Sequence, residues 1–189
     1  MATDSTATEI LLITGPAGVG KSTLSWALGD ALAEARIRHA AVESDELDRV
    51  FPKPDTGQLD ALSPGARDIS QINLAALWAS YRALGHTRLI MSGVMLHVDF
   101  DQRWILAAIP DAAITVVRLR ASDETLVARL DRREVGAGRE AQIERSLRQA
   151  RRMASEAGGG LIEVATDGRT PQDLAREILD ATGWAAAAG

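Results

Sequence analysis

The segment from Gly15 to Ser22 carries the clearest chemistry in this chain. It reads Gly-Pro-Ala-Gly-Val-Gly-Lys-Ser and matches the phosphate-loop pattern G-x-x-x-x-G-K-[ST] at every fixed position. Main-chain N–H groups in such a loop point at a bound phosphate, and the lysine reaches the β- and γ-phosphates. The 189-residue sequence has only one other lysine, Lys53, so Lys21 is not the product of a lysine-rich composition.

This loop predicts that the chain binds the cofactors ATP and Mg2+. We expect Lys21 to stabilise the transferred phosphate and the Ser22 hydroxyl to bind the metal ion. A glycine-rich turn without a ligand is the alternative. The flanks favour the loop, because Ile10–Thr14 is typical of a buried strand and Ser22–Arg36 of an amphipathic helix. The residues predicted to bind the nucleotide here are Gly15, Pro16, Ala17, Gly18, Val19, Gly20, Lys21, Ser22 and Thr23.

Two carboxylates follow the next apolar run. Glu43 and Asp45 lie two residues apart at the end of a strand expected at His39–Glu43, so their side chains project to the same side. One can orient Mg2+ through water, and the other can accept the proton of an acceptor hydroxyl. Asp45 is the candidate general base and Glu43 the candidate metal-orienting group, although the sequence leaves open which of them orients Mg2+. The alternative is that they cap a short helix at Glu46–Val50.

A parallel sheet is needed to bring these groups together. Strand patterns alternate with helical patterns, which predicts an α/β fold of three layers with helices on both faces of a five-stranded parallel sheet. Ligands of such sheets bind at the carboxyl ends of the strands. The expected strands are Ile10–Thr14, His39–Glu43, Arg88–Ser92, Ala113–Leu119 and Leu161–Ala165. The expected helices are Ser22–Arg36, Ile69–Leu84, Asp101–Ala108, Ser122–Glu134, Glu140–Glu156 and Pro171–Thr182.

Two further features bear on the architecture. Val50–Arg67 holds three prolines and two glycines, so we expect a loop or a loosely helical insert there. Trp26 and Trp78 fall at apolar positions of helices and are predicted to be core residues.

Composition narrows the class of protein. The net charge is −5 and there is no cysteine, which argues against non-specific nucleic-acid binding and excludes disulfides and thiolate metal sites. No apolar run approaches the roughly 20 residues of a membrane span, and Met1–Thr8 lacks the features of a signal peptide. We therefore expect a cytoplasmic protein that binds neither membrane nor nucleic acid. Its single domain would span residues 9–184, between a disordered segment at 1–8 and a frayed tail at 185–189; its oligomeric state is open.

Two motifs that are missing from the sequence exclude or disfavour some classes of phosphate-loop protein. A GTPase needs a guanine-reading N-K-x-D motif, and the sequence has none. A motor or AAA-type ATPase usually has acidic residues at the end of the third strand, where this chain has Ser92 and Gly93. An AAA-type assignment then fits only at the level of the loop, and a kinase that takes its acid from Glu43 and Asp45 is favoured.

With Glu43-Ser-Asp45 and Ser92-Gly93 in place, the chain resembles small-metabolite kinases of the nucleoside-monophosphate-kinase-like fold. Shikimate kinase, gluconate kinase, adenylylsulfate kinase and chloramphenicol phosphotransferase are examples. They carry an acidic residue or a D-x-D motif after the second strand and small residues after the third. The resemblance runs from Glu9 to Thr182. It implies the strand order 2-3-1-4-5, a substrate-binding segment at about 45–70 and a short helical lid at about 132–142.

Arginines around the expected lid are a further point of resemblance. In adenylate-kinase-like proteins a strand leads into a helix that bears arginines just before the lid. The likeness implies that Arg129 stacks on adenine and that Arg133 contacts the transferred phosphate. Arg132 is the alternative candidate for the phosphate contact. Guanidinium groups suit both roles because they are planar, always charged and forked. Arg139 is expected to close over substrate, and Arg169 to border adenine. The alternative is that these arginines form ordinary ion pairs on helix surfaces.

The predicted acceptor site draws on residues from several separate segments. The residues predicted to bind the acceptor are Glu43, Asp45, Arg67, Ser92, Gly93 and Arg139. Neither shikimate kinase's arginine-rich acceptor segment nor gluconate kinase's D-G-D-x-x-H pattern is reproduced. The resemblance implies transfer of the γ-phosphate of ATP to a hydroxyl of a small molecule, either a metabolite or an antibiotic. A nucleoside or nucleoside-monophosphate kinase and a non-catalytic or regulatory ATP-binding module are the alternatives.

Overall fold

The computed structural model describes residues 7–133, 138–156 and 160–185, and its centre is one parallel five-stranded sheet. The strands are β1 (Thr8–Thr14), β2 (Ala40–Glu43), β3 (Arg88–Gly93), β4 (Ala112–Arg120) and β5 (Ile162–Ala165). They lie in the order β2-β3-β1-β4-β5. The predicted fold class and strand order are therefore confirmed.

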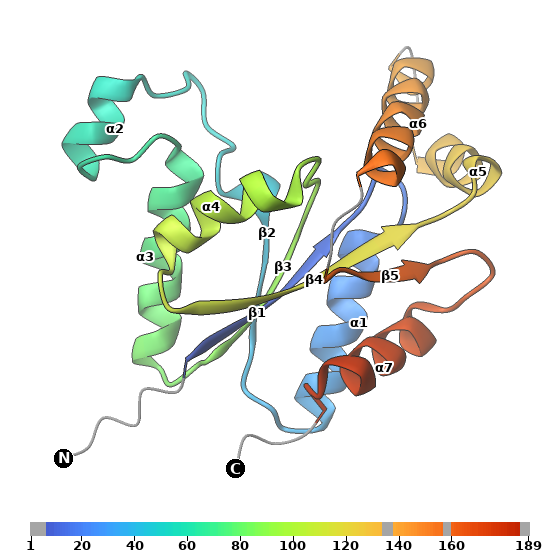
Figure 1. The fold of residues 1–189 in the computed structure, drawn as a ribbon, viewed down its shortest axis with the longest axis horizontal. Coiled ribbons are helices and arrows are strands. Elements are labelled where there is room, and N and C mark those ends of the chain that lie inside the picture. Colours follow the sequence, from blue (N-terminus) through green and yellow to red (C-terminus); the bar gives the residue numbers. More distant parts are fainter. Residues whose placement is uncertain (1–6, 134–137, 157–159, 186–189) are drawn as a thin grey trace.

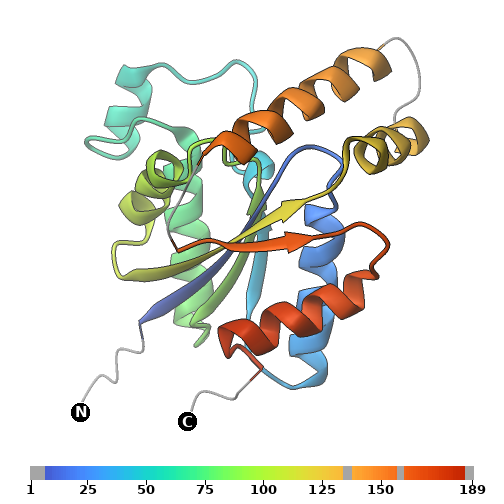
Figure 2. The same ribbon diagram turned by 45° about the vertical axis from the view of Figure 1, so that its right-hand side comes forward.

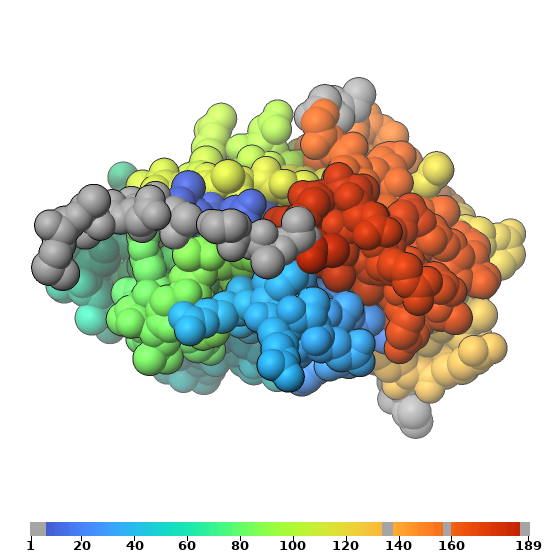
Figure 3. Space-filling model, turned by 90° about the horizontal axis from the view of Figure 1, so that it is seen from below, coloured from blue at the N-terminus to red at the C-terminus, as the bar shows by residue number. Residues whose placement is uncertain are grey.

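Helices cover both faces of the sheet (Figures 1 and 2). The helices are α1 (Lys21–Glu34), α2 (Thr56–Leu62), α3 (Ile69–Ala83), α4 (Val98–Ala108), α5 (Asp123–Arg133), α6 (Arg139–Ser155) and α7 (Pro171–Thr182), with a short 3-10 helix, η1 (Ser44–Glu46). Helices α1 and α7 pack side by side on one face (Figure 3), and α3 and α4 pack on the other. Alternate residues of β1 supply the two cores: Leu11 and Ile13 face α1 and α7, whereas Ile10 and Leu12 face α3 and α4.

The strand register brings the predicted chemical groups to one edge of the sheet. Thr14, the last residue before the phosphate loop, pairs with Gly93, and Glu43 pairs with Ser92. Because all strands are parallel, the phosphate loop, the β2–η1 turn and the end of β3 meet at the carboxyl edge. Helices α5 and α6 lie beyond this edge on the β4 side, and α2 lies on the opposite side (Figure 1).

Local side-chain chemistry explains several helix ends. Thr170 accepts a hydrogen bond from the Asp173 N–H and Pro171 is the first residue of α7, so this helix begins where expected. Ser122 accepts from the Thr125 N–H at the start of α5. No helix in the described part of the chain is both long and apolar enough to cross a membrane.

The structure refines two expectations about the chain from Thr8 to Leu62. Strand β1 begins at Thr8, which was predicted to be disordered but is buried and accepts a hydrogen bond from the indole of Trp78. Of the other residues predicted to be disordered, 1–6 lie outside the described residues. The insert at Val50–Arg67 contains a true helix, α2, because Asp55 and Gln58 form a reciprocal capping box at its start.

Other expectations differ from the structure as well. The short helix predicted at Glu46–Val50 is instead η1, which begins two residues earlier. Trp78 is buried as predicted, but the side chain of Trp26 is 73% exposed, because the α1 face that bears it is covered by neither the sheet nor α7. The predicted lid at about 132–142 includes residues 134–137, and the predicted tail includes 186–189; both ranges lie outside the described residues.

Candidate active site

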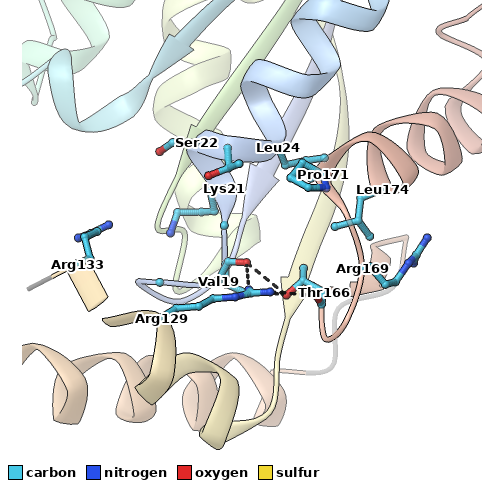
Figure 4. Close-up of a pocket in the computed structure, with 13 residues that line it drawn as sticks. Val19, Lys21, Ser22, Leu24, Arg129, Arg133, Thr166, Arg169, Pro171 and Leu174 are labelled. Atoms are coloured by element: carbon cyan, nitrogen blue, oxygen red, sulfur yellow. Dashed lines mark hydrogen bonds between the residues drawn. The ribbon is translucent and has the colours of Figure 1, made fainter. Parts of the chain in front are cut away.

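A cavity of about 380 Å³ opens above the phosphate loop, between α1, α5 and the start of α7 (Figure 4). It gathers most of the loop residues together with the predicted arginines. The residues that line it are Gly18, Val19, Gly20, Lys21, Ser22, Thr23, Leu24, Arg129, Arg133, Thr166, Arg169, Pro171 and Leu174. Nine of the residues predicted to act on the nucleotide therefore lie around one cavity.

Glycines let the loop pass close to its neighbours. A Cβ atom on Gly15 would lie 2.7 Å from the main-chain oxygen of Leu119, and one on Gly18 would lie 2.8 Å from Leu130 Cγ. Gly18 also has a φ of +79°, which strains any L-residue with a side chain. Gly20 is the N-cap of α1, so the first N–H groups of this helix lack intrahelical partners and are available to an anion.

Main-chain oxygens of the loop hold the side chain of Lys21. Its Nζ donates hydrogen bonds to the main-chain oxygens of Gly15 and Pro16, each at 3.0 Å. Burial lowers the pKa of Lys21 from its ordinary value of 10.5 to about 8. The charges of Asp45 and Glu43 oppose this shift and that of Arg133 adds to it, so all three groups lie near the ammonium group. The loop lysine therefore feels the charges of two carboxylates and one guanidinium group.

Helix η1 holds Asp45 at this edge. A Cβ atom on Gly93 would overlap the Ser44 hydroxyl and lie 3.0 Å from Ser44 Cβ, so a glycine at the end of β3 lets the β2–η1 turn approach closely. Glu43 occupies the N-cap position of η1, but its side chain makes no capping hydrogen bond there, and Asp45 lies within η1 rather than before it. The capping alternative thus does not account for either carboxylate.

Arg129 ties the loop to the opposite side of the cavity. Its guanidinium donates to the main-chain oxygen of Val19 at 2.8 Å, to Thr166 Oγ1 at 2.9 Å and to the main-chain oxygen of Thr166 at 3.0 Å (Figure 4). The guanidinium of Arg129, which was predicted to stack on adenine, therefore joins the phosphate loop to the β5–α7 connection. Arg169 lines the cavity but pairs with Glu177 of α7, and its guanidinium is turned away from the loop.

Several predicted residues lie elsewhere. Both main-chain polar groups of Ala17 bond to α6, so its N–H is not free for a phosphate. Arg139 begins α6 and lies 3.5 Å from the carboxylate of Asp131 rather than at the cavity. Arg67 is exposed before α3, and Ser92 is buried at the end of β3. The acceptor-binding roles of Arg67, Ser92, Gly93 and Arg139 stay predictions.

The β5–α7 connection and the start of α7 contribute Thr166 and Leu174, which sequence reasoning missed, beside Pro171 of the segment Asp167–Pro171 that was expected to border adenine. Thr166, Pro171 and Leu174 form a wall of the cavity that is largely apolar. The wall is fixed by Asp167, whose carboxylate accepts hydrogen bonds from Thr125 and Ser122 at the start of α5. These bonds lower the pKa of Asp167 to about 2. The available signal was the Thr170–Pro171 helix start, which places the first turn of α7 beside the loop.

A magnesium ion fits this site only together with phosphate oxygens. The described residues contain no group of three histidine, cysteine or acidic side chains that could hold a metal alone. The Ser22 hydroxyl is exposed at the cavity, and Glu43 and Asp45 are the carboxylates whose charges act on the neighbouring Lys21. This donor set matches the way Mg2+ is bound through few protein ligands, waters and substrate phosphates.

A known protein family matches the part of the chain that carries most of the site. A family profile described as an AAA domain matches residues 11–153, which include the phosphate loop, both carboxylates and the α5 arginines. The chain belongs to this AAA domain family. The sequence interpretation limited the likeness to AAA-type proteins to the phosphate loop. The matched range shows that the likeness extends well beyond the loop. The end of β3 nevertheless carries Ser92 and Gly93 and no carboxylate.

Solved structures share the fold over nearly the whole chain. The Deinococcus radiodurans tunicamycin resistance protein is 20% identical, with a TM-score of 0.56 over 93% of this chain and 96% of that protein. A gluconokinase from Sinorhizobium meliloti 1021 is 17% identical, with a TM-score of 0.57 over 93% and 92% of the two chains. The Mycobacterium tuberculosis APS kinase is 17% identical, with a TM-score of 0.53 over 94% and 98%. A sequence comparison with curated proteins gave no match. The AAA-domain chain thus has the kinase-like fold that the sequence predicted.

Proposed function

We propose that this chain is an ATP-dependent phosphotransferase that moves the γ-phosphate of Mg-ATP to a hydroxyl group of a small molecule. One observation carries the proposal: the β2–η1 turn that bears Asp45 packs against Gly93, which pairs with the last residue before the phosphate loop, and the charge of Asp45 raises the pKa of Lys21. A carboxylate beside this lysine, at a sheet edge whose β3 end has none, is suited to accept a proton from an attacking hydroxyl.

Each residue of the site has a defined task in this reaction. Lys21 binds the phosphate oxygens and, with Arg133, stabilises the negative charge that spreads over them during transfer. Asp45 accepts the proton of the acceptor hydroxyl. The oxygen of that hydroxyl forms a bond to the γ-phosphorus, and the bond between this phosphorus and the leaving oxygen of ADP breaks. Mg-ATP, held in part by Ser22 and Glu43, supplies the phosphoryl group and a cation that neutralises its charge.

The apolar wall of the cavity suits a nucleobase. Pro171 and Leu174 lie across the cavity from the Arg129 guanidinium, which is hydrogen-bonded at its edge and so leaves its face available for stacking. The names of the fold neighbours support a small-molecule acceptor: one confers tunicamycin resistance, and two are kinases for gluconate and for APS. Their identities of 17–20% leave the acceptor of this chain to experiment.

The test is a screen for acceptor-dependent release of ADP from Mg-ATP by the full chain. The panel contains hydroxylated metabolites and antibiotics, nucleosides and nucleoside monophosphates. Asp45→Asn is the key variant, because it removes the base and keeps the shape; the expected loss of turnover is about 100-fold or more. Full turnover by Asp45→Asn with the best acceptor would rule out the general-base role. Mg-ATP binding without transfer to any member of the panel would favour a regulatory ATP-binding module instead.

A further inference from the structure

Helix α6 grips one residue of the phosphate loop by its main chain. The side-chain oxygen of Gln149 accepts a hydrogen bond from the Ala17 N–H at 3.0 Å, and the Ser146 hydroxyl donates one to the Ala17 oxygen at 2.6 Å. Ser146 is fully buried. The two side chains are three residues apart, so they project from the same face of α6. The pair therefore satisfies both polar groups of a single loop residue.

The helix that carries this pair is itself anchored to the sheet. Arg118, buried at the end of β4, donates to the main-chain oxygens of Met153 at 2.9 Å and Glu156 at 3.1 Å, and it pairs with the Glu156 carboxylate at 2.9 Å. These contacts fix the last turn of α6 against β4. Figures 1 and 2 show α6 next to the connection between β1 and α1, so the position of α6 directly affects the position of the loop.

The loop is held from a second side only two residues further on. Arg129 of α5 donates to the main-chain oxygen of Val19 at 2.8 Å. Gly18, which has a φ of +79°, lies between the two held residues. With Ala17 and Val19 both fixed, the conformation of Gly18 and the direction of the N–H groups that follow it are fixed too.

We propose that Ser146 and Gln149 are positioning residues, which preset the phosphate loop so that the N–H groups from Gly20 to Ser22 face a triphosphate. The inference rests on the nucleotide binding in the proposed function. A loop that is already ordered loses less conformational freedom when its ligand binds, so its affinity is higher. Without the pair, the Ala17 peptide loses its partners and the loop samples conformations that do not bind phosphate.

The test uses the full chain and a non-hydrolysable ATP analogue with Mg2+, titrated by calorimetry well below the melting temperature. Gln149→Met keeps the length of the side chain and removes the acceptor; Ser146→Ala removes the donor. Each should raise the Kd by about three- to tenfold. Ser155→Ala, an exposed serine at the end of α6, is the matched control and should leave the Kd within about twofold. A merely structural role would lower the melting temperature and leave the Kd of the folded protein unchanged.

Unchanged Kd values in folded Gln149→Met and Ser146→Ala would overturn the proposal. Should Ser146→Ala not fold, the partly buried Gln149 still decides the matter, because its replacement leaves no void. The proposed function fails separately: wild-type protein that binds the analogue but phosphorylates no acceptor contradicts phosphotransfer and leaves the positioning role intact. Wild-type protein that binds no triphosphate contradicts both.

Discussion

Raising the pH from 7 to 9 should weaken triphosphate binding by removing the charge of Lys21. Its pKa is lowered by burial to about 8, so about nine-tenths of the side chain is charged at pH 7 and about one-tenth at pH 9. The last proton of a phosphate dissociates near pH 6, so the nucleotide charge is constant over this range. If only the ammonium form binds, the apparent Kd rises about tenfold; a lysine with its ordinary pKa of 10.5 would leave it nearly flat.

Calorimetric titration with Mg2+ and a non-hydrolysable ATP analogue at pH 7, 8 and 9 measures this effect. Lys21→Arg keeps its charge throughout and should give a flat profile. Asp45 raises the pKa of Lys21 and Arg133 lowers it, so Asp45→Asn should move the midpoint to lower pH and Arg133→Gln to higher pH. A wild-type Kd that is equal at pH 7 and pH 9 would refute the reasoning, because it would mean that Lys21 stays charged.

Three further changes test other parts of the site. Gly93→Ala should lower kcat about tenfold and leave the Kd for the ATP analogue within about twofold, because the new methyl group displaces Ser44 and with it η1. Adding Ser44→Ala should recover part of the lost kcat. A normal kcat in Gly93→Ala would contradict this close packing. Arg129→Lys should raise the KM for ATP about tenfold, since lysine cannot replace the forked hydrogen bonds, and an unchanged KM would show that these bonds are not needed. In urea denaturation, Trp78→Ala should lower the free energy of unfolding by about 3–5 kcal/mol and the exposed Trp26→Ala by less than about 0.5 kcal/mol; equal losses would contradict their different burial.

Much of the fold was readable where a residue type dictates local geometry. The expected helix Pro171–Thr182 has the observed bounds, because a threonine cap, a first-turn proline and Gly183 at φ +72° define its ends. The phosphate loop was predicted from a pattern in which each fixed position has one physical task. The parallel strands then brought Glu43 and Gly93 to the same edge, as expected from the strand register.

The missed features depend on contacts between distant segments. The hydrogen bonds that Ala17 accepts from Ser146 and donates to Gln149 join residues 129 and 132 positions apart, and no local pattern encodes them. Periodicity places Trp26 at an apolar position of α1, but burial depends on which element covers that face, and no element in the described part of the chain does so. Thr166 was missed because a lone polar residue after a short strand has no distinguishing pattern.

Following the γ-phosphate is the most direct test of the central claim. The full chain is incubated with Mg2+, ATP labelled with 18O in its γ-phosphate and the best acceptor, and the products are identified by mass spectrometry. We predict a labelled phosphate ester on an acceptor hydroxyl, which is lost in Lys21→Met and strongly reduced in Asp45→Asn. Label found only in inorganic phosphate, or joined to a phosphate group of a nucleotide acceptor, would contradict phosphoryl transfer to an alcohol.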